Sequence, residues 1–172
     1  MNQFNKALTY VNENLYEPNH LMIKDIREEA QNSEYGAGTF QLNTKLVRFR
    51  VAKTTPTKIG QFVVFWEKDK ANKNQAYSYE QAPDLLVINT FTNNNRFGQF
   101  IFPKEVLLKQ KILKTATTNG KMAIRVYPSW DKPVSNQAIN TQKWQLEYFI
   151  ELDDDNLIEM PSQNLKKLYC NP

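Results

Sequence analysis

Segments typical of β-strands are concentrated in the middle of this chain. Residues 40–53, 61–67, 84–91 and 97–102 are rich in β-branched and aromatic residues, and short turn sequences separate them. Segments 61–67 and 84–91 are apolar on both faces, which is typical of interior strands. Helical patterns lie outside this region, toward both ends. Such segregation predicts an α+β fold with a mixed or largely antiparallel central sheet of about five or six strands, flanked by helices.

Amphipathic helices are expected on both sides of the strand segments. Apolar side chains recur every three or four positions in residues 3–16, and residues 23–35 continue as a second helical stretch. After the strands, Pro103 stands where a helix can begin. Residues 121–128 then form one more strand, and residues 137–152 form a last amphipathic helix before a short polar tail.

Size and composition limit the class of protein. The chain has 172 residues, of which 41% are hydrophobic, and this length fits a single domain spanning residues 1–172. One Cys and one His exclude a disulfide framework and a Cys/His zinc site. No signal-peptide pattern opens the sequence, and no stretch approaches the roughly 20 apolar residues of a membrane span. We therefore expect a cytoplasmic protein with no membrane partner.

The net charge of +4 conceals a basic middle. Residues 34–130 carry a net charge of +9, whereas residues 1–33 and 131–172 carry −2 and −3. A polyanion such as nucleic acid is attracted to a surface of this sign. The alternative interpretation is a solvated surface of mixed charge that has no such partner.

Four cations lie close together on one strand and on the turn after it. Alternation from residue 45 onward predicts that Arg48 and Arg50 face away from the core, about 6–7 Å apart. Lys53 and Lys58 add charge from the following turn. Because guanidinium forks suit phosphate oxygens, we interpret this edge as a phosphate-contacting surface. An exposed strand that positive charge protects from edge pairing is the alternative.

A second group combines cations with aromatic side chains. Arg125 precedes Tyr127 and Trp130, which can stack on exposed bases at about 1–3 kcal/mol per base. Alternatively, the two aromatic residues close the end of the core. The residues predicted to contact nucleic acid are Arg48, Arg50, Lys53, Lys58, Lys104, Arg125, Tyr127 and Trp130.

A Mg²⁺-dependent nuclease is a second hypothesis. Such enzymes hold the metal with an Asp at a strand end and with an acidic residue or Gln placed two positions before a Lys. Asp84, Gln99 and Lys104 approach this pattern, and Glu34 could add a carboxylate. Gln99 lies five positions before Lys104, so a straight strand places their side chains on opposite faces. We therefore assign no catalytic residue, metal or other cofactor, and Mg²⁺ is expected only if the nuclease hypothesis holds.

Four separated blocks of the sequence resemble the MepB-like family of small bacterial proteins. They lie at residues 47–66, 98–104, 121–130 and 141–145, and the similarity extends over roughly residues 30–152. The resemblance implies a restriction-endonuclease-like core and a nucleic-acid-binding role, and it brings no established catalytic residues. An incomplete nuclease pattern then suits a scaffold that binds DNA or RNA without cutting it.

The same resemblance supplies a third hypothesis. One family member is encoded beside a multidrug efflux pump and its repressor. This neighbourhood implies a non-enzymatic partner protein linked to multidrug-response regulation.

Overall fold

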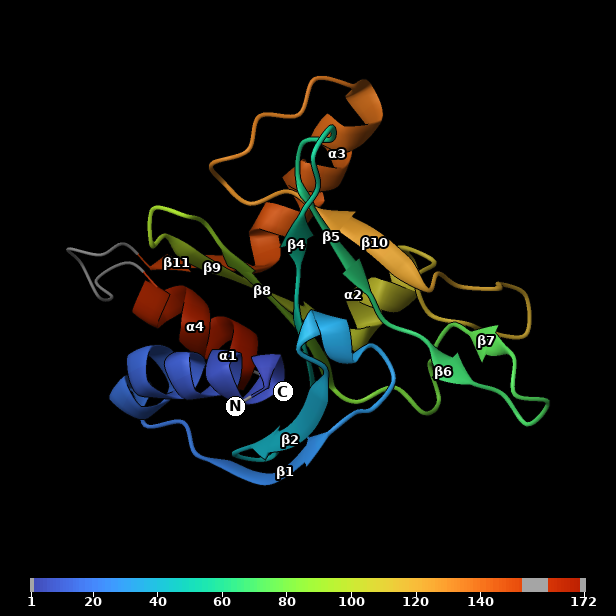
Figure 1. Cartoon of the computed structure of the whole chain (residues 1–172), viewed down its shortest axis with the longest axis horizontal. Coiled ribbons are helices and arrows are strands. Elements are labelled where there is room, and N and C mark those ends of the chain that lie inside the picture. The colour runs from blue at the N-terminus through green and yellow to red at the C-terminus, as the bar shows by residue number, and fades with distance from the viewer. Residues whose placement is uncertain (1, 153–160, 171–172) are drawn as a thin grey trace.

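A mixed sheet of six strands forms the centre of the protein. The computed structural model describes residues 2–152 and 161–170, and its main sheet has the strand order β1-β2-β3-β8-β9-β11 (Figure 1). The strands are β1 (Ile23–Glu28), β2 (Gly38–Leu42), β3 (Lys45–Val51), β8 (Leu85–Phe91), β9 (Phe97–Pro103) and β11 (Phe149–Leu152). Neighbours are antiparallel except β3 and β8, which pair in parallel. The predicted α+β fold with a mixed central sheet is confirmed.

A smaller sheet packs on the main one. Its strand order is β10-β5-β4, and β6 and β7 form a separate two-stranded hairpin. These strands are β4 (Lys53–Thr54), β5 (Gln61–Val64), β6 (Glu67–Lys68), β7 (Asn74–Gln75) and β10 (Ala123–Val126). In Figure 1, the hairpin that joins β4 to β5 extends from the body of the protein.

In the described part of the chain, four α-helices surround these sheets. They are α1 (Gln3–Val11), α2 (Lys104–Lys109), α3 (Asn136–Gln145) and α4 (Pro161–Cys170). A π-helical turn, Asn12–Tyr16, extends α1, and 3-10 turns lie at Glu17–Asn19, Ser33–Tyr35 and Leu146–Tyr148. Figure 1 shows α1 and α4 side by side, and α3 beside the tip of the β4–β5 hairpin. Among the described residues, no helix has the length and apolar character needed to cross a bilayer.

The central strands β3, β8 and β9 of the main sheet are largely buried on both faces. Val47, Phe49 and Val51 of β3 point into a core that includes the apolar sides of α1 and α4, as the alternation predicts. Ala52 just after β3 and Ile88 of β8 belong to a second core beneath the small sheet. The middle strand β3 is therefore mostly buried beyond Leu46, which is 55% exposed.

Three secondary-structure predictions are wrong. Residues 23–28 form an edge strand whose side chains are mostly exposed, so their apolar spacing reflects no buried helical face. Residues 149–152 form β11, because the 3-10 turn at 146–148 ends the helix and Ile150 and Leu152 then alternate inward. The supposed polar tail contains α4, whose Leu165, Leu168 and Tyr169 are buried, while residues 153–160 lie outside the described part.

A buried polar network links the central strands to the helices. Gln99 of β9 donates to the Asn89 Oδ1 atom of β8 at 2.7 Å and accepts from the Tyr169 hydroxyl at 2.5 Å. Tyr169 in turn lies 2.9 Å from the Tyr16 hydroxyl. Because both rings are fully buried, desolvation raises the pKa of Tyr16 and the pKa of Tyr169 above the usual value of a tyrosine.

The raised pKa values predict a loss of stability at high pH. The folded state holds these two protons more tightly than the unfolded state, so their contribution is complete below about pH 10 and falls as the pH rises above it. Thermal unfolding followed by circular dichroism between pH 8 and pH 11 should show this fall. A Tyr16→Phe/Tyr169→Phe variant should show a shallower fall, and an equal slope in both proteins would contradict the assignment.

Candidate functional site

Arg50 is buried and ion-paired, contrary to the sequence prediction. Its side chain is 0% exposed, and Nη1 donates to Glu29 Oε2 at 2.6 Å. Nη1 also donates to the Phe49 carbonyl, and Nε donates to the carbonyl of Val64 on β5. The outward assignment was wrong because β3 is an interior strand and the small sheet covers its second face.

Arg48 lies in the same cluster. Its Nε is 3.4 Å from Glu29 Oε1, and its guanidinium lies 3.4 Å from the centroid of the Tyr77 ring. Desolvation lowers the pKa of Arg48 and raises the pKa of Tyr77, whose hydroxyl donates to Glu29 at 3.3 Å. The two arginines therefore share one carboxylate and join the sheets, and their side chains are 13% and 0% exposed.

Charge reversal at the two arginines should unfold the protein. In an Arg48→Glu/Arg50→Glu variant three carboxylates would occupy a largely desolvated site, and breaking a buried ion pair costs about 3–5 kcal/mol. Urea unfolding should therefore show a much lower midpoint than in the parent protein. Lys58→Glu, on an exposed turn, is the matched control and should leave the midpoint nearly unchanged. A double variant as stable as that control would contradict the burial.

Lys53 and Lys104 are directed toward separate tyrosines. The Lys53 ammonium lies 4.7 Å from the ring centroid of Tyr35 and 4.0 Å from Glu34. The Lys104 ammonium lies 4.7 Å from the ring centroid of Tyr79. Neither lysine is paired with Glu29, the carboxylate that Arg48 and Arg50 share.

Trp130 packs against residues at one end of the main sheet. The Arg96 guanidinium lies 4.9 Å from its ring centroid, and Phe149 packs against it at 6.0 Å. Arg96 also pairs with Glu151 of β11. The interpretation that Trp130 closes the end of the core fits these contacts.

The four candidate nuclease residues are not brought together. The Lys104 amide donates to the Asp84 carbonyl at 3.0 Å, so these two residues are neighbours at one end of β8 and β9. The Asp84 carboxylate instead accepts from the Leu46 amide at 2.8 Å. Gln99 pairs with Asn89, about 17 Å along the strand from Asp84.

Glu34 lies on an exposed turn, where its charged partner is Lys53. Within the described residues, no group of three or more His, Cys, Asp or Glu side chains is placed to hold a metal ion. The carboxylates named by the nuclease hypothesis therefore form no common site.

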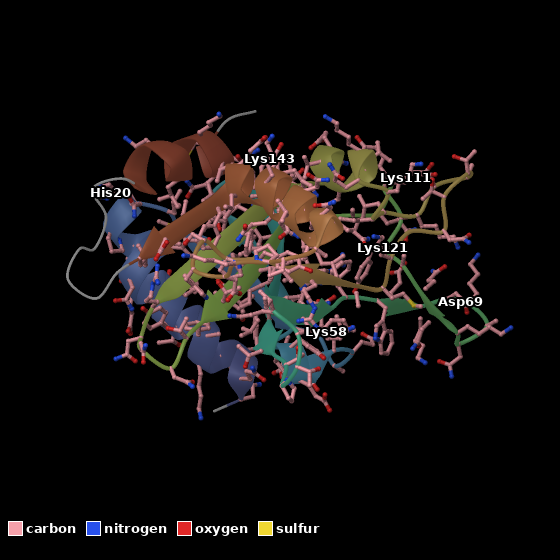
Figure 2. The ribbon with its side chains drawn as sticks, turned by 90° about the horizontal axis from the view of Figure 1, so that it is seen from above. His20, Lys58, Asp69, Lys111, Lys121 and Lys143 are labelled. Atoms are coloured by element: carbon pink, nitrogen blue, oxygen red, sulfur yellow. The ribbon has the colours of Figure 1, made fainter. Side chains whose placement is uncertain are left out.

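A groove brings together three of the predicted contact residues. Lys58, Arg125 and Tyr127 line a hollow of about 640 Å³ between the β4–β5 hairpin, β10 and α3. Lys121 is a further cation of its lining, and within residues 2–152 and 161–170 no carboxylate lines it. Figure 2 places Lys58 and Lys121 away from His20, which lies at the opposite end of the molecule. This groove is the candidate functional site.

Arg125 fixes the hairpin that carries Lys58. Its Nη1 donates to Thr55 Oγ1 at 3.1 Å, to the Ile59 carbonyl at 3.4 Å and to the Gly60 carbonyl at 3.2 Å. All of these bonds come from one nitrogen of the fork. Arg125 therefore holds the turn in place from the wall of the groove.

Gly60 allows the hairpin to lie against β10. Its φ is +86°, and a Cβ there would lie 2.8 Å from the Tyr127 ring and 2.8 Å from the Val126 carbonyl. A side chain would therefore be strained by the backbone and would collide with the wall of the groove.

Two glutamines of α3 complete the opposite wall. The Gln145 amide donates to the Arg125 carbonyl at 3.0 Å and accepts from the Tyr127 amide at 2.9 Å, as a neighbouring strand would do. Gln142 donates to the carbonyls of Tyr127, Pro128 and Asp131. The edge strand β10 is thereby covered by a helix, which also prevents edge pairing.

Loss of the Gln145 amide should weaken the fold. Gln145→Leu keeps a similar volume but leaves the Arg125 carbonyl and the Tyr127 amide without partners at a position that is 1% exposed. An unsatisfied buried backbone group costs about 1–3 kcal/mol, so urea unfolding should show a loss of that size. Gln137→Leu is the matched control, because the Gln137 side chain is exposed and makes no hydrogen bond within the described residues. Equal midpoints for the two variants would refute the strand-like role.

Sequence reasoning missed Lys121, Trp144 and Gln145. Lys121 follows Gly120, whose φ of +72° turns the chain toward β10. Trp144 and Gln145 are three and four positions after Thr141, and all three line the groove from one face of α3. The periodicity of these mainly polar residues could have identified that face.

Comparison with known proteins supports the sequence resemblance. The family model described as MepB-like matches residues 29–151. A crystal structure of MepB is 40% identical to the chain, with a TM-score of 0.75, and the match covers 90% of this chain and 99% of that one. Curated proteins give no match. Since the family model spans well over half of the sequence, the chain belongs to the MepB-like family.

Proposed function

We propose that this protein binds nucleic acid, DNA or RNA, in the groove between the β4–β5 hairpin, β10 and α3. The observation that carries the proposal is the lining of this groove. Lys58, Lys121 and Arg125 supply positive charge, and Tyr127 and Trp144 supply aromatic surface. Among the residues that the structure describes, the lining contains no carboxylate. Cations combined with stacking surfaces are characteristic of proteins that bind nucleic acid.

The charges around the groove favour a polyanion over a small neutral ligand. The stretch from Lys104 to Gln145 holds eight Lys or Arg residues and two acidic residues. Lys58 and Lys121 are exposed, so their ammonium groups can contact phosphates as point charges. Arg125 adds charge from the wall, although one nitrogen of its guanidinium is committed to the hairpin.

The proposed scaffold is restriction-endonuclease-like and binds without cutting. A mixed sheet containing a parallel pair and covered on both faces is compatible with such a core. Asp84 and Gln99 lie far apart on that sheet, and the Asp84 carboxylate accepts a hydrogen bond from the Leu46 amide. A fold alone does not establish an activity, so the groove and not the scaffold carries the proposal.

Salt-dependent binding tests the proposal. Three phosphate contacts predict that log K falls with log salt concentration at a slope of about −2 to −3. Lys58→Gln/Lys121→Gln should reduce this slope by about 1.4–1.8 and weaken binding to a fluorescein-labelled oligonucleotide, measured by anisotropy.

Lys24→Gln is the matched control for that measurement. Lys24 is an exposed cation on β1, which Figure 1 shows at the opposite side of the molecule from α3. Its replacement should leave the slope unchanged. Absence of binding at 50 mM salt to both DNA and RNA would refute the proposed function.

A further inference from the structure

We propose that a cavity beside α1 binds a small aromatic carboxylate. The cavity lies between α1, the last residues of β3 and β8, and the turn that joins β8 to β9, and its volume is about 660 Å³. Small-ligand pockets have volumes of about 300–1,000 Å³. This site is independent of the proposed nucleic-acid function, because among the described residues its lining shares none with the groove beside α3.

The cavity lies where two parallel strands end. β3 and β8 are the parallel neighbours of the main sheet, and their last residues, Val51 and Phe91, both line the cavity. After these residues the connections diverge, since β3 leads into the small sheet and β8 turns back into β9. In open α/β sheets, diverging connections leave a crevice outside the carboxyl ends of parallel strands, and ligands bind there. The same arrangement favours a ligand at this end of β3 and β8.

Apolar and aromatic side chains supply most of the surface deep in the cavity. Ala7 and Val51 are buried, whereas Tyr10 and Phe91 are partly exposed. The Tyr10 ring lies edge-on to Phe91, with centroids 5.5 Å apart, and edge-on to Phe97 at 5.4 Å. These contacts hold the rings in place, so an aromatic ligand that packs against them costs little conformational freedom of the protein.

Lys6 supplies the charge of the cavity. It is the charged residue among the described lining residues, and its exposed side chain makes no ion pair or hydrogen bond within the described part of the chain. Lys6 and Tyr10 are four positions apart on α1, so their side chains are neighbours on one face of the helix. An ammonium group without a partner favours an anionic ligand. A carboxylate attached to an aromatic ring can therefore contact Lys6 while its ring packs against Tyr10.

Three neutral polar side chains add hydrogen-bonding capacity at the same cavity. Gln3 and Asn95 are exposed, and their amide groups make no hydrogen bond within the described residues. The Thr92 hydroxyl accepts from the Arg96 amide at 3.1 Å and donates to no acceptor within that part of the chain. Amide and hydroxyl donors can bind the oxygens of a carboxylate, which accepts at both of them. These donors and Lys6 therefore select a ligand that has one anionic end.

A pair of compounds that differ in charge tests the proposal. Naphthoate and naphthalenemethanol share a ring system, and each is titrated into nitrogen-15-labelled protein and followed by two-dimensional NMR. Both should shift the amide signals of Ala7, Val51 and Thr92, and naphthoate should bind with a Kd of about 1 mM or below, as expected for a ligand of its size. Naphthalenemethanol should bind about two- to five-fold more weakly, because it makes no ion pair with Lys6. Octanoate, which has a carboxylate but no ring, should also bind more weakly than naphthoate.

Variants at exposed positions locate the site without disturbing the core. Lys6→Gln should weaken naphthoate binding about two- to five-fold and leave naphthalenemethanol binding unchanged. Lys24→Gln is the matched control, because Lys24 is an exposed cation of β1 outside the lining, and both affinities should stay as in the parent protein. Gln3→Trp places a large ring in the cavity and should abolish binding of both compounds. A melting temperature close to that of the parent protein shows that such a loss is not caused by unfolding.

Different results would overturn different parts of the proposal. Equal affinities for naphthoate and naphthalenemethanol, or an unchanged naphthoate affinity in Lys6→Gln, would overturn the anionic class of the ligand. Octanoate binding as tight as naphthoate binding would overturn its aromatic class. Signal shifts confined to the groove beside α3, or no shifts at millimolar concentrations of any compound, would overturn the site itself. Oligonucleotide binding is measured separately, so none of these results decides the proposed function.

Discussion

The buried contact between Arg50 and Glu29 organises the rest of the structure. Arg50 extends from the middle strand of the main sheet and bonds to the carbonyl of Val64 on the small sheet. Two sheets that pack face to face usually do so through apolar side chains alone. Here a charged side chain with 0% exposure lies between them, and its stability depends on a carboxylate that follows β1. The position of the small sheet is therefore tied to a specific hydrogen-bonding geometry.

The loop after β1 reinforces this connection. Asn32 donates to the Trp66 carbonyl at 3.0 Å and accepts from the Trp66 amide at 3.3 Å, and Tyr35 packs edge-on against Phe62. One short segment thus supplies the counter-charge for the arginines and a cap for the end of β5. The groove is built from the same small sheet, at β5, β10 and their hairpin. The contacts of this loop contain no groove residue except Phe62, whereas the groove residues Arg125 and Gln145 hold the hairpin and α3 against β10.

Much of the fold follows from local sequence, whereas the site does not. The turn at Asn43 and the inward side of β3 could be predicted because period-two alternation fixes which residues share a face. Alternation could not show whether the other face of β3 is solvated. The small sheet covers that face, and its strands extend as far along the chain as residue 126. Arginines at alternate positions would be equally compatible with an exposed edge strand and with a strand buried between two sheets. Only the partner, Glu29, distinguishes the two, and it lies 21 positions from Arg50.

The net charge of a sequence segment also differs from the charge that the folded protein exposes on its surface. Arg48 and Arg50 contribute to the basic middle of the sequence, but both lie in a largely buried cluster in which Glu29 offsets one of their two charges. Lys121, which no local pattern singled out, lies instead in a groove whose lining, as far as the structure describes the chain, holds no carboxylate. A phosphate is attracted by cations that remain hydrated before binding, because a buried ion pair has already exchanged its hydration for a partner. The positive surface of this protein is therefore better identified by removing paired arginines from the count than by summing the charge of a segment. By that criterion Lys58 and Lys121, which line the groove beside α3, are counted because both are exposed.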